Sequence, residues 1–218
     1  MFIGHTAVAL AAKKAAPQVR FGTLLFAALF ADLLFPVLIL LGIEHVMPAP
    51  GITAVTPYDF YDYPISHSLL TDAAFAYIFA GIFFLKYREW SGAVILSLAV
   101  LSHWLLDFIS HRPDMPLVPG LHTVVGLGLW NSVMWTVIVE VLLFAIGVYL
   151  YLRTTTPADK LGSIIFWSFI GLQLMMYAGN IFANIPVDSR TMAMGSLMQW
   201  LFIPWAYWID RHRFIRTK

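Results

Sequence analysis

The chain has 218 residues, of which 60% are hydrophobic and 11% are charged, with a formal net charge of +1 and no cysteine. So apolar a composition excludes an ordinary soluble domain, and the near-zero net charge excludes a nucleic-acid-binding surface. Without cysteine, disulfides and thiolate metal sites are excluded, which leaves His, Asp and Glu as metal ligands. The sequence therefore predicts one integral membrane domain over residues 1–218.

The first predicted element is a short helix over residues 2–16, which is apolar but too short to cross a bilayer. The segment carries Lys13 and Lys14 near its end and is followed by Pro17. We expect a half-length helix that enters the membrane from the cytoplasmic side and turns into the first full span. We expect no removable signal peptide, because a basic region followed by a cleavage site is missing.

Six further segments have about the 20 apolar residues that a bilayer core requires. They are residues 21–43, 68–86, 91–111, 131–152, 161–184 and 192–209. Lys and Arg gather at alternate ends of these segments, which indicates that those ends face the cytoplasm. The predicted fold class is all-α, a polytopic membrane helix bundle of about six transmembrane spans plus the half-length helix. The predicted location is the inner, cytoplasmic membrane, with both termini on the cytoplasmic side.

Three ionisable side chains lie four residues apart within the third segment: His103, Asp107 and His111. This spacing places them on one helix face. Each costs roughly 2.5 to 3.5 kcal/mol at membrane depth, so a partner, a cavity or a metal is expected. A histidine and a carboxylate at i and i+4 suit a metal, whereas the alternative is a hydrogen-bonded pair between helices. We expect His111, next to the interface, to cap the helix or line an entrance.

Most other acidic and histidine side chains within the segments reach one common depth. Counted from the cytoplasmic ends at 1.5 Å per residue, this depth is roughly 18 to 21 Å. The residues concerned are His5, Asp32, Asp72, His103 and Glu140, with Asp107 one turn higher and His67 at the outer start of its helix. Asp72 and Glu140 are therefore candidates for a catalytic base or for a group that orients a ligand. A helix-capping role for Asp72 and a protonated structural role for Glu140 are the alternatives.

The outer loops after the first and third segments are rich in Pro and Gly. Such composition is typical of ordered, lid-like coverings and equally of ordinary connectors. Glu44, His45 and His122 lie in these loops, and we expect their side chains at the surface.

Four short motifs occur in a fixed order: Gly4-His5-Thr6, Ala31-Asp32, His67-Ser68-Leu69 and Ser102-His103-x-x-x-Asp107. With these motifs, the chain from residue 4 to about residue 120 resembles the membrane-bound metal-dependent hydrolase family, also described as LexA-binding, inner-membrane-associated hydrolases. The resemblance implies a metal site with the ligands His5, Asp32, His67, His103 and Asp107. The chain departs from the family pattern at Leu34, where a second aspartate is usual, and at Asp62-Tyr63-Pro64, where His-Arg-Gly is usual.

Together these features predict a membrane-embedded hydrolase that uses a divalent metal, Zn²⁺ or Mn²⁺. The site depth suggests a membrane lipid partner and a lipid or lipid-linked ester or phosphoester as substrate. One alternative is a transporter or an ion- or proton-conducting protein that uses the same polar layer. The other is a non-catalytic assembly protein whose polar cluster only holds the bundle together.

Overall fold

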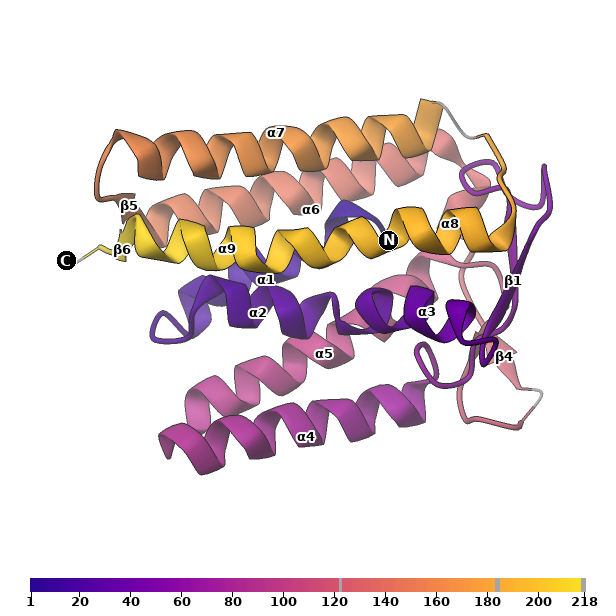
Figure 1. The fold of residues 1–218 in the computed structure, drawn as a ribbon, viewed down its shortest axis with the longest axis horizontal. Coiled ribbons are helices and arrows are strands. Elements are labelled where there is room, and N and C mark those ends of the chain that lie inside the picture. The colour runs from indigo at the N-terminus through magenta and orange to yellow at the C-terminus, as the bar shows by residue number, and fades with distance from the viewer. Residues whose placement is uncertain (122, 183–184, 217–218) are drawn as a thin grey trace.

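The computed structural model describes residues 1–121, 123–182 and 185–216 and shows a bundle of roughly aligned helices (Figure 1). The helices are α1 Ile3–Ala15, α2 Phe21–Ala28, α3 Phe30–Leu40, α4 Leu69–Tyr87, α5 Trp90–Ser110, α6 Val133–Thr154, α7 Lys160–Phe182, α8 Ser189–Ser196 and α9 Phe202–Arg211, with 3-10 turns η1 Leu129–Asn131 and η2 Leu197–Leu201. The short strands pair antiparallel as β1 His45–Pro48 with β2 Tyr58–Asp62, β3 Met115–Pro116 with β4 Val124–Val125, and β5 Thr155–Pro157 with β6 Arg213–Ile215.

Four helices, α4 to α7, are long and apolar enough to cross a membrane. Helices α2 and α3 pass the same test as a pair, but they are bent by 54° where Leu29 leaves helical geometry. The predicted membrane helix bundle is confirmed. The expected number of six spans is not reproduced within the described residues, because the last segment is divided among α8, η2 and α9.

The predicted half-length helix is confirmed as α1, which has 13 residues and packs against α2, α5 and α6 inside the bundle. Its last turn is fixed by the Lys13 ammonium, which donates to the Val19 carbonyl over 2.6 Å and lies 3.8 Å from the Asp210 carboxylate on α9. The Asp210 oxygens also accept the N–H groups of Phe21 and Gly22 at the start of α2. This ion pair and cap join α1, α2 and α9 at one end of the bundle.

Close backbone contact between α1 and α6 depends on Gly147. A Cβ at this position would lie 2.6 Å from the Ala7 carbonyl oxygen, so only glycine permits the observed approach. We expect Gly147→Leu to push α1 away from α6 and to lower the free energy of unfolding by ~1–3 kcal/mol. Thermal unfolding in detergent would measure this, with Gly171→Leu as control because open space surrounds Gly171. Equal stability of the two variants would contradict the prediction.

The start of α5 is stabilised by a half-buried N-cap, Glu89, which accepts hydrogen bonds from the Ser91 and Gly92 N–H groups, each over 2.7 Å. Hydrogen bonds lower the pKa of Glu89 from 4.5 to about 2, and the bond with Ser91 contributes most, followed by the bond with Gln18. Because the folded-state pKa is lowered, this stabilisation is present above pH 4.5 and disappears as the pH falls toward 2. The melting temperature of Glu89→Gln should therefore lie below that of the wild type at pH 6 and approach it near pH 2. A constant difference across that range would contradict the assignment.

At the other end of the bundle, the long loops are ordered and packed onto the helix ends. An apolar cluster there contains Phe35, Val46, Tyr63, Trp104 and Met115. The loop after α5 is tied to β2 by an ion pair between Arg112 and Asp59. These contacts hold the loops against the helix ends and agree with either expectation, a covering or a connector.

Candidate metal centre

Five ionisable side chains meet in the bundle beneath these loops. They come from α1, α3, the turn before α4, and α5: His5, Asp32, His67, His103 and Asp107. All except Asp32 are almost completely buried, and the Asp32 side chain is 26% exposed. The structure thus brings together the whole set of predicted ligands, although these residues are spread over a hundred positions of the chain.

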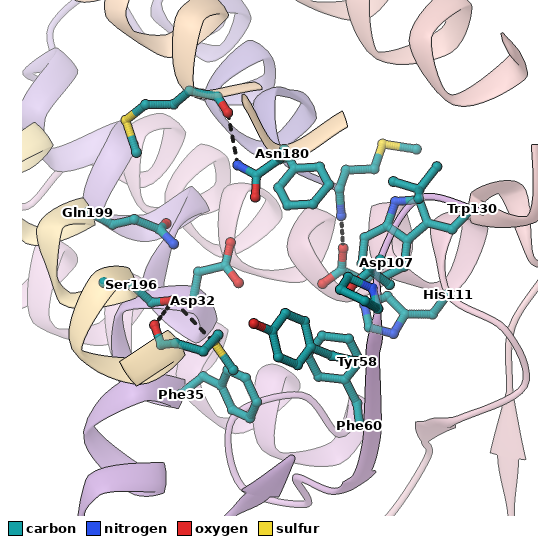
Figure 2. A pocket seen from close by; sticks show the side chains of 18 of the residues that line it. Asp32, Phe35, Tyr58, Phe60, Asp107, His111, Trp130, Asn180, Ser196 and Gln199 are labelled. Carbon is teal, nitrogen blue, oxygen red and sulfur yellow. Dashed lines mark hydrogen bonds and ion pairs between the residues drawn. The ribbon is translucent and has the colours of Figure 1, made fainter. Parts of the chain in front are cut away.

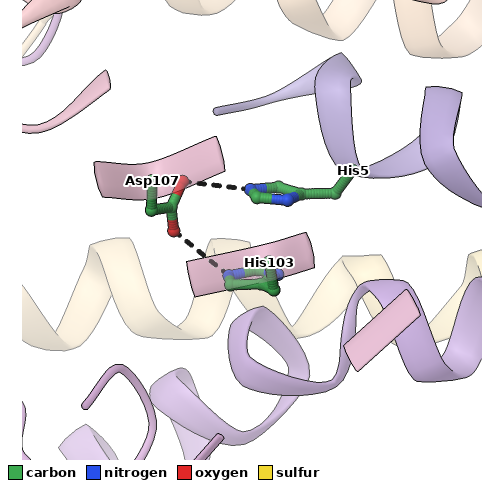
Figure 3. A group of neighbouring side chains, drawn as sticks. All are labelled: His5, His103 and Asp107. Atoms are coloured by element: carbon green, nitrogen blue, oxygen red, sulfur yellow. Dashed lines mark hydrogen bonds and ion pairs between the residues drawn. The ribbon is translucent and has the colours of Figure 1, made fainter. Parts of the chain in front are cut away.

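The Asp107 carboxylate lies between His5 and His103 (Figure 3), with His67 also nearby. Its Oδ1 atom is 3.1 Å from His5 Nε2, and its Oδ2 atom is 3.2 Å from His103 Nε2 and 3.7 Å from His67 Nε2. The imidazole rings of His5 and His103 stack with their centroids 3.8 Å apart. The i, i+4 spacing of His103 and Asp107 therefore does place both side chains at one point, as the sequence predicted.

Asp32 approaches the same group from α3. Its Oδ1 atom is 3.7 Å from His67 Nε2 and 3.8 Å from His103 Nε2. Two sets of three residues have ligand atoms within 4.8 Å of one another: His5, His103 and Asp107, and Asp32, His67 and His103. Each set is compact enough to hold a metal ion, and His103 belongs to both.

Hydrogen bonds orient two of the imidazoles. The His103 Nδ1 atom lies 2.9 Å from the Ala28 carbonyl oxygen, next to the bend between α2 and α3. Because a carbonyl only accepts, Nδ1 carries the proton, and Nε2 presents its lone pair to the two carboxylates. The Nε2 atom is buried and lies 3.2 Å from Asp107 Oδ2, without the geometry of a regular hydrogen bond. A buried imidazole nitrogen that faces two carboxylates is the feature expected of a metal ligand.

His67 is oriented through a hydroxyl group. Its Nδ1 atom lies 2.6 Å from Ser66 Oγ, which in turn donates to Glu44 Oε2 over 2.6 Å. The Glu44 carboxylate also accepts the N–H groups of Ile65 and Ser66. Carboxylates that fix histidine ligands from behind recur in metal sites. Glu44 therefore belongs to the surroundings of the site.

The surface expectation for Glu44 is wrong, because its side chain is completely buried. It turns inward since its oxygens satisfy two backbone N–H groups and the Ser66 hydroxyl ahead of α4. The neighbouring His45 is exposed as expected and pairs with Asp62. His122 lies outside the described residues.

Glu140 and Asp72, the two predicted catalytic candidates, both lie behind the ligands. Glu140 Oε2 accepts the N–H groups of Phe2, Ile3 and Gly4 over 2.8, 2.9 and 3.3 Å. Glu140 thus caps the N-terminus of α1, where a negative charge is favoured. The last N–H group that it accepts, from Gly4, directly precedes His5. Asp72 is buried in the first turn of α4 and accepts the Trp104 N–H over 3.3 Å. Neither carboxylate lines the cavity beside the site.

That cavity, of about 460 Å³, reaches the group at Asp32, His67 and Asp107 (Figure 2). The buried His111 side chain also lines it, and the His111 Nδ1 atom lies 3.0 Å from Asp114 Oδ1. His111 is the C-cap residue of α5, so the expected capping position is confirmed. Sequence reasoning missed the far wall, which contains Asn180, Ser196 and Gln199. In the sequence, these three residues stand out only as polar side chains within apolar segments, and those segments carry no motif.

The site carries an excess of negative charge. With neutral imidazoles, the Asp32 and Asp107 carboxylates give the group two negative charges in a largely buried environment. Such burial is costly unless a cation compensates for it. The Met1 amino group forms an ion pair with Asp107. This ammonium offsets one of the two negative charges, and a cation bound by the carboxylates and the histidine nitrogens would compensate for the other.

Fold and site together define a helical membrane protein with a buried His/Asp group that is suited to a metal ion. Comparison of the chain with protein-family models, with curated proteins and with solved structures finds no match. The resemblance to the membrane-bound metal-dependent hydrolases accordingly remains a prediction.

Proposed function

We propose that the protein is a membrane-embedded, metal-dependent hydrolase that cleaves a lipid or lipid-linked ester or phosphoester. We also propose that it is related to the family that its motifs resemble. One observation carries the proposal. Three histidines and two aspartates, with two of the imidazoles oriented by hydrogen bonds, converge at the end of a cavity of about 460 Å³. A purely structural cluster needs no such cavity.

Zn²⁺ or Mn²⁺ suits a set of nitrogen and oxygen ligands and, when bound, supplies Lewis-acid chemistry and a more acidic water. The residues of the chain hold and orient the site. Asp32 and Asp107 supply the negative charge, and the hydrogen bonds to Ala28 and Ser66 direct two histidine nitrogens inward. His111, held by Asp114 at the cavity wall, is placed to hydrogen-bond with a substrate.

For the location, we propose the cytoplasmic membrane with both termini in the cytoplasm. The charge pattern supports this orientation: Lys13 and Lys14, the turn between α4 and α5, the turn between α6 and α7, and the C-terminal residues are rich in Lys and Arg. These segments lie at one end of the bundle in Figure 1, opposite to the long loops. The site would then open toward the outer side, where lipid headgroups of the outer leaflet are within reach.

The test is the metal content of detergent-purified wild-type protein, measured by mass spectrometry before and after chelation and reloading. We expect near-stoichiometric Zn or Mn, and hydrolysis of lipid esters or phosphoesters that stops on chelation and returns on reloading. A folded protein that binds neither metal after reloading would overturn the proposal.

A second candidate function, metal or proton transport, is favoured by one observation. The bend between α2 and α3 places Asp32 in the first turn after a helix break, an arrangement that transporters use for ion sites. Against it, the ionisable residues gather at one depth rather than along a path. Ion flux into proteoliposomes distinguishes the two: uptake of Zn²⁺ or Mn²⁺ without lipid hydrolysis would favour transport.

A further inference from the structure

The cavity beside the His/Asp group has two chemically distinct walls. One wall consists of the candidate metal centre, with Asp32 and Asp107 facing the space (Figure 2). The opposite wall comes from α7, α8 and η2 and contains Asn180, Ser196 and Gln199. A smaller cavity of about 70 Å³ shares Asp32, Asn180 and Gln199 with the large one and extends the space toward α1. A molecule in the cavity therefore contacts both walls.

The opposite wall is polar but uncharged. Asn180 Nδ2 donates to the Met176 carbonyl over 3.0 Å, which fixes the amide and leaves its oxygen toward the cavity. The Gln199 amide group also points into the space in Figure 2. Amide and hydroxyl groups pair well with carbonyl, hydroxyl or N–H groups of a neutral ligand.

The lining lacks the side chains that usually bind phosphate. Among the described residues, no Lys or Arg side chain lines either cavity. The nearby Arg112 is paired with Asp59 and Asp114 instead. Phosphate groups are typically recognised by Arg or Lys, so the walls suit a neutral group better than a phosphoester.

The cavity reaches the surface at two small residues. Gly179 on α7 and Gly195 on α8 both line it, both are exposed, and open space surrounds the Cβ position of each. Met176, Ile185 and Met192 line the same side. An apolar opening of this kind in a membrane protein suits a hydrocarbon chain that extends from the site toward the lipid.

We propose that the cavity binds an uncharged fatty acyl ester or amide, with its carbonyl at the His/Asp group and its chain leaving between Gly179 and Gly195. This inference rests on the proposed function, excludes the phosphoester from its substrate class and adds the acyl amide. Cleavage needs only water: the water oxygen forms a bond with the carbonyl carbon, the bond to the leaving oxygen or nitrogen breaks, and that atom takes up a proton.

The test uses a photoreactive diazirine monoacylglycerol with detergent-purified, zinc-loaded full-length protein, and crosslinks are mapped by mass spectrometry. Competitors are monoacylglycerol and lysophosphatidate of the same chain length, which differ only in the phosphate. We expect crosslinks on α7 and α8, and competition at least about tenfold stronger by monoacylglycerol. Equal or stronger competition by lysophosphatidate would overturn the proposal.

Gly179→Leu and Gly195→Leu fill the opening without changing a candidate ligand, and we expect each to reduce crosslinking about tenfold. Gly171→Leu is the matched control, because Gly171 lies on the same helix as Gly179 but does not line the cavity. Undiminished crosslinking in both cavity variants would overturn the proposal. Metal content is measured on the same samples, so a failure of metal binding, which contradicts the hydrolase, is distinguished from a failure of ester binding.

Discussion

His103→Ala is expected to remove bound metal almost completely from the purified protein. His103 belongs to both compact sets of three candidate ligands, and its Nε2 atom faces both carboxylates. Its loss leaves each set with two ligands, which is too few to hold a divalent ion firmly. Asp107→Ala should have the same effect, because the Asp107 carboxylate lies within 3.7 Å of three histidine nitrogens. Metal content by mass spectrometry is the measurement.

The matched control for both variants is His45→Ala, since His45 is exposed, pairs with Asp62, stacks on Tyr61 and belongs to neither set of candidate ligands. It should retain wild-type metal content. Thermal unfolding of each variant distinguishes a binding site from a structural cluster. A variant that stays folded but lacks metal supports the metal site, whereas variants that keep their metal contradict the ligand assignment. If the wild type itself held no metal and the variants were merely less stable, the result would favour the non-catalytic assembly protein.

Glu140→Ala is expected to give the second large effect, on the stability of α1. The change leaves the N–H groups of Phe2, Ile3 and Gly4 without their shared acceptor in a buried environment. Each unsatisfied buried group costs about 1 to 3 kcal/mol, so several kcal/mol are at stake. Because His5 follows this cap directly, metal affinity should fall together with stability. Unfolding in detergent and metal titration would measure the two effects.

Glu140→Gln separates the capping role from catalysis. Its amide oxygen still accepts backbone N–H groups, so it should keep much of the stability and the metal affinity that alanine loses. If Glu140→Gln retained both but lost hydrolysis, the reaction would need the Glu140 charge itself, beyond the cap. Wild-type stability of Glu140→Ala would contradict the cap.

The sequence alone predicted the long helices α4 to α6 and the residues that cluster. The lengths of apolar runs predicted α4, α5 and α6 to within two residues at each end, because bilayer thickness fixes helix length. The rise of a helix per residue fixes depth, so counting from the predicted cytoplasmic ends placed His5, Asp32 and His103 in one layer. The i, i+4 spacing placed His103 and Asp107 on one face, because helix geometry is local.

The tertiary structure decided what each polar residue contacts. The burial of Glu44 and the cap formed by Glu140 both depend on backbone N–H groups from other segments, and residue spacing does not encode such partners. The bend at Leu29, which presents the Ala28 carbonyl to His103, likewise depends on packing. The neutral far wall of the cavity combines α7, α8 and η2, which share no motif with the site. Local periodicity specifies helices and their faces, whereas the chemistry of a cavity arises only where several faces meet.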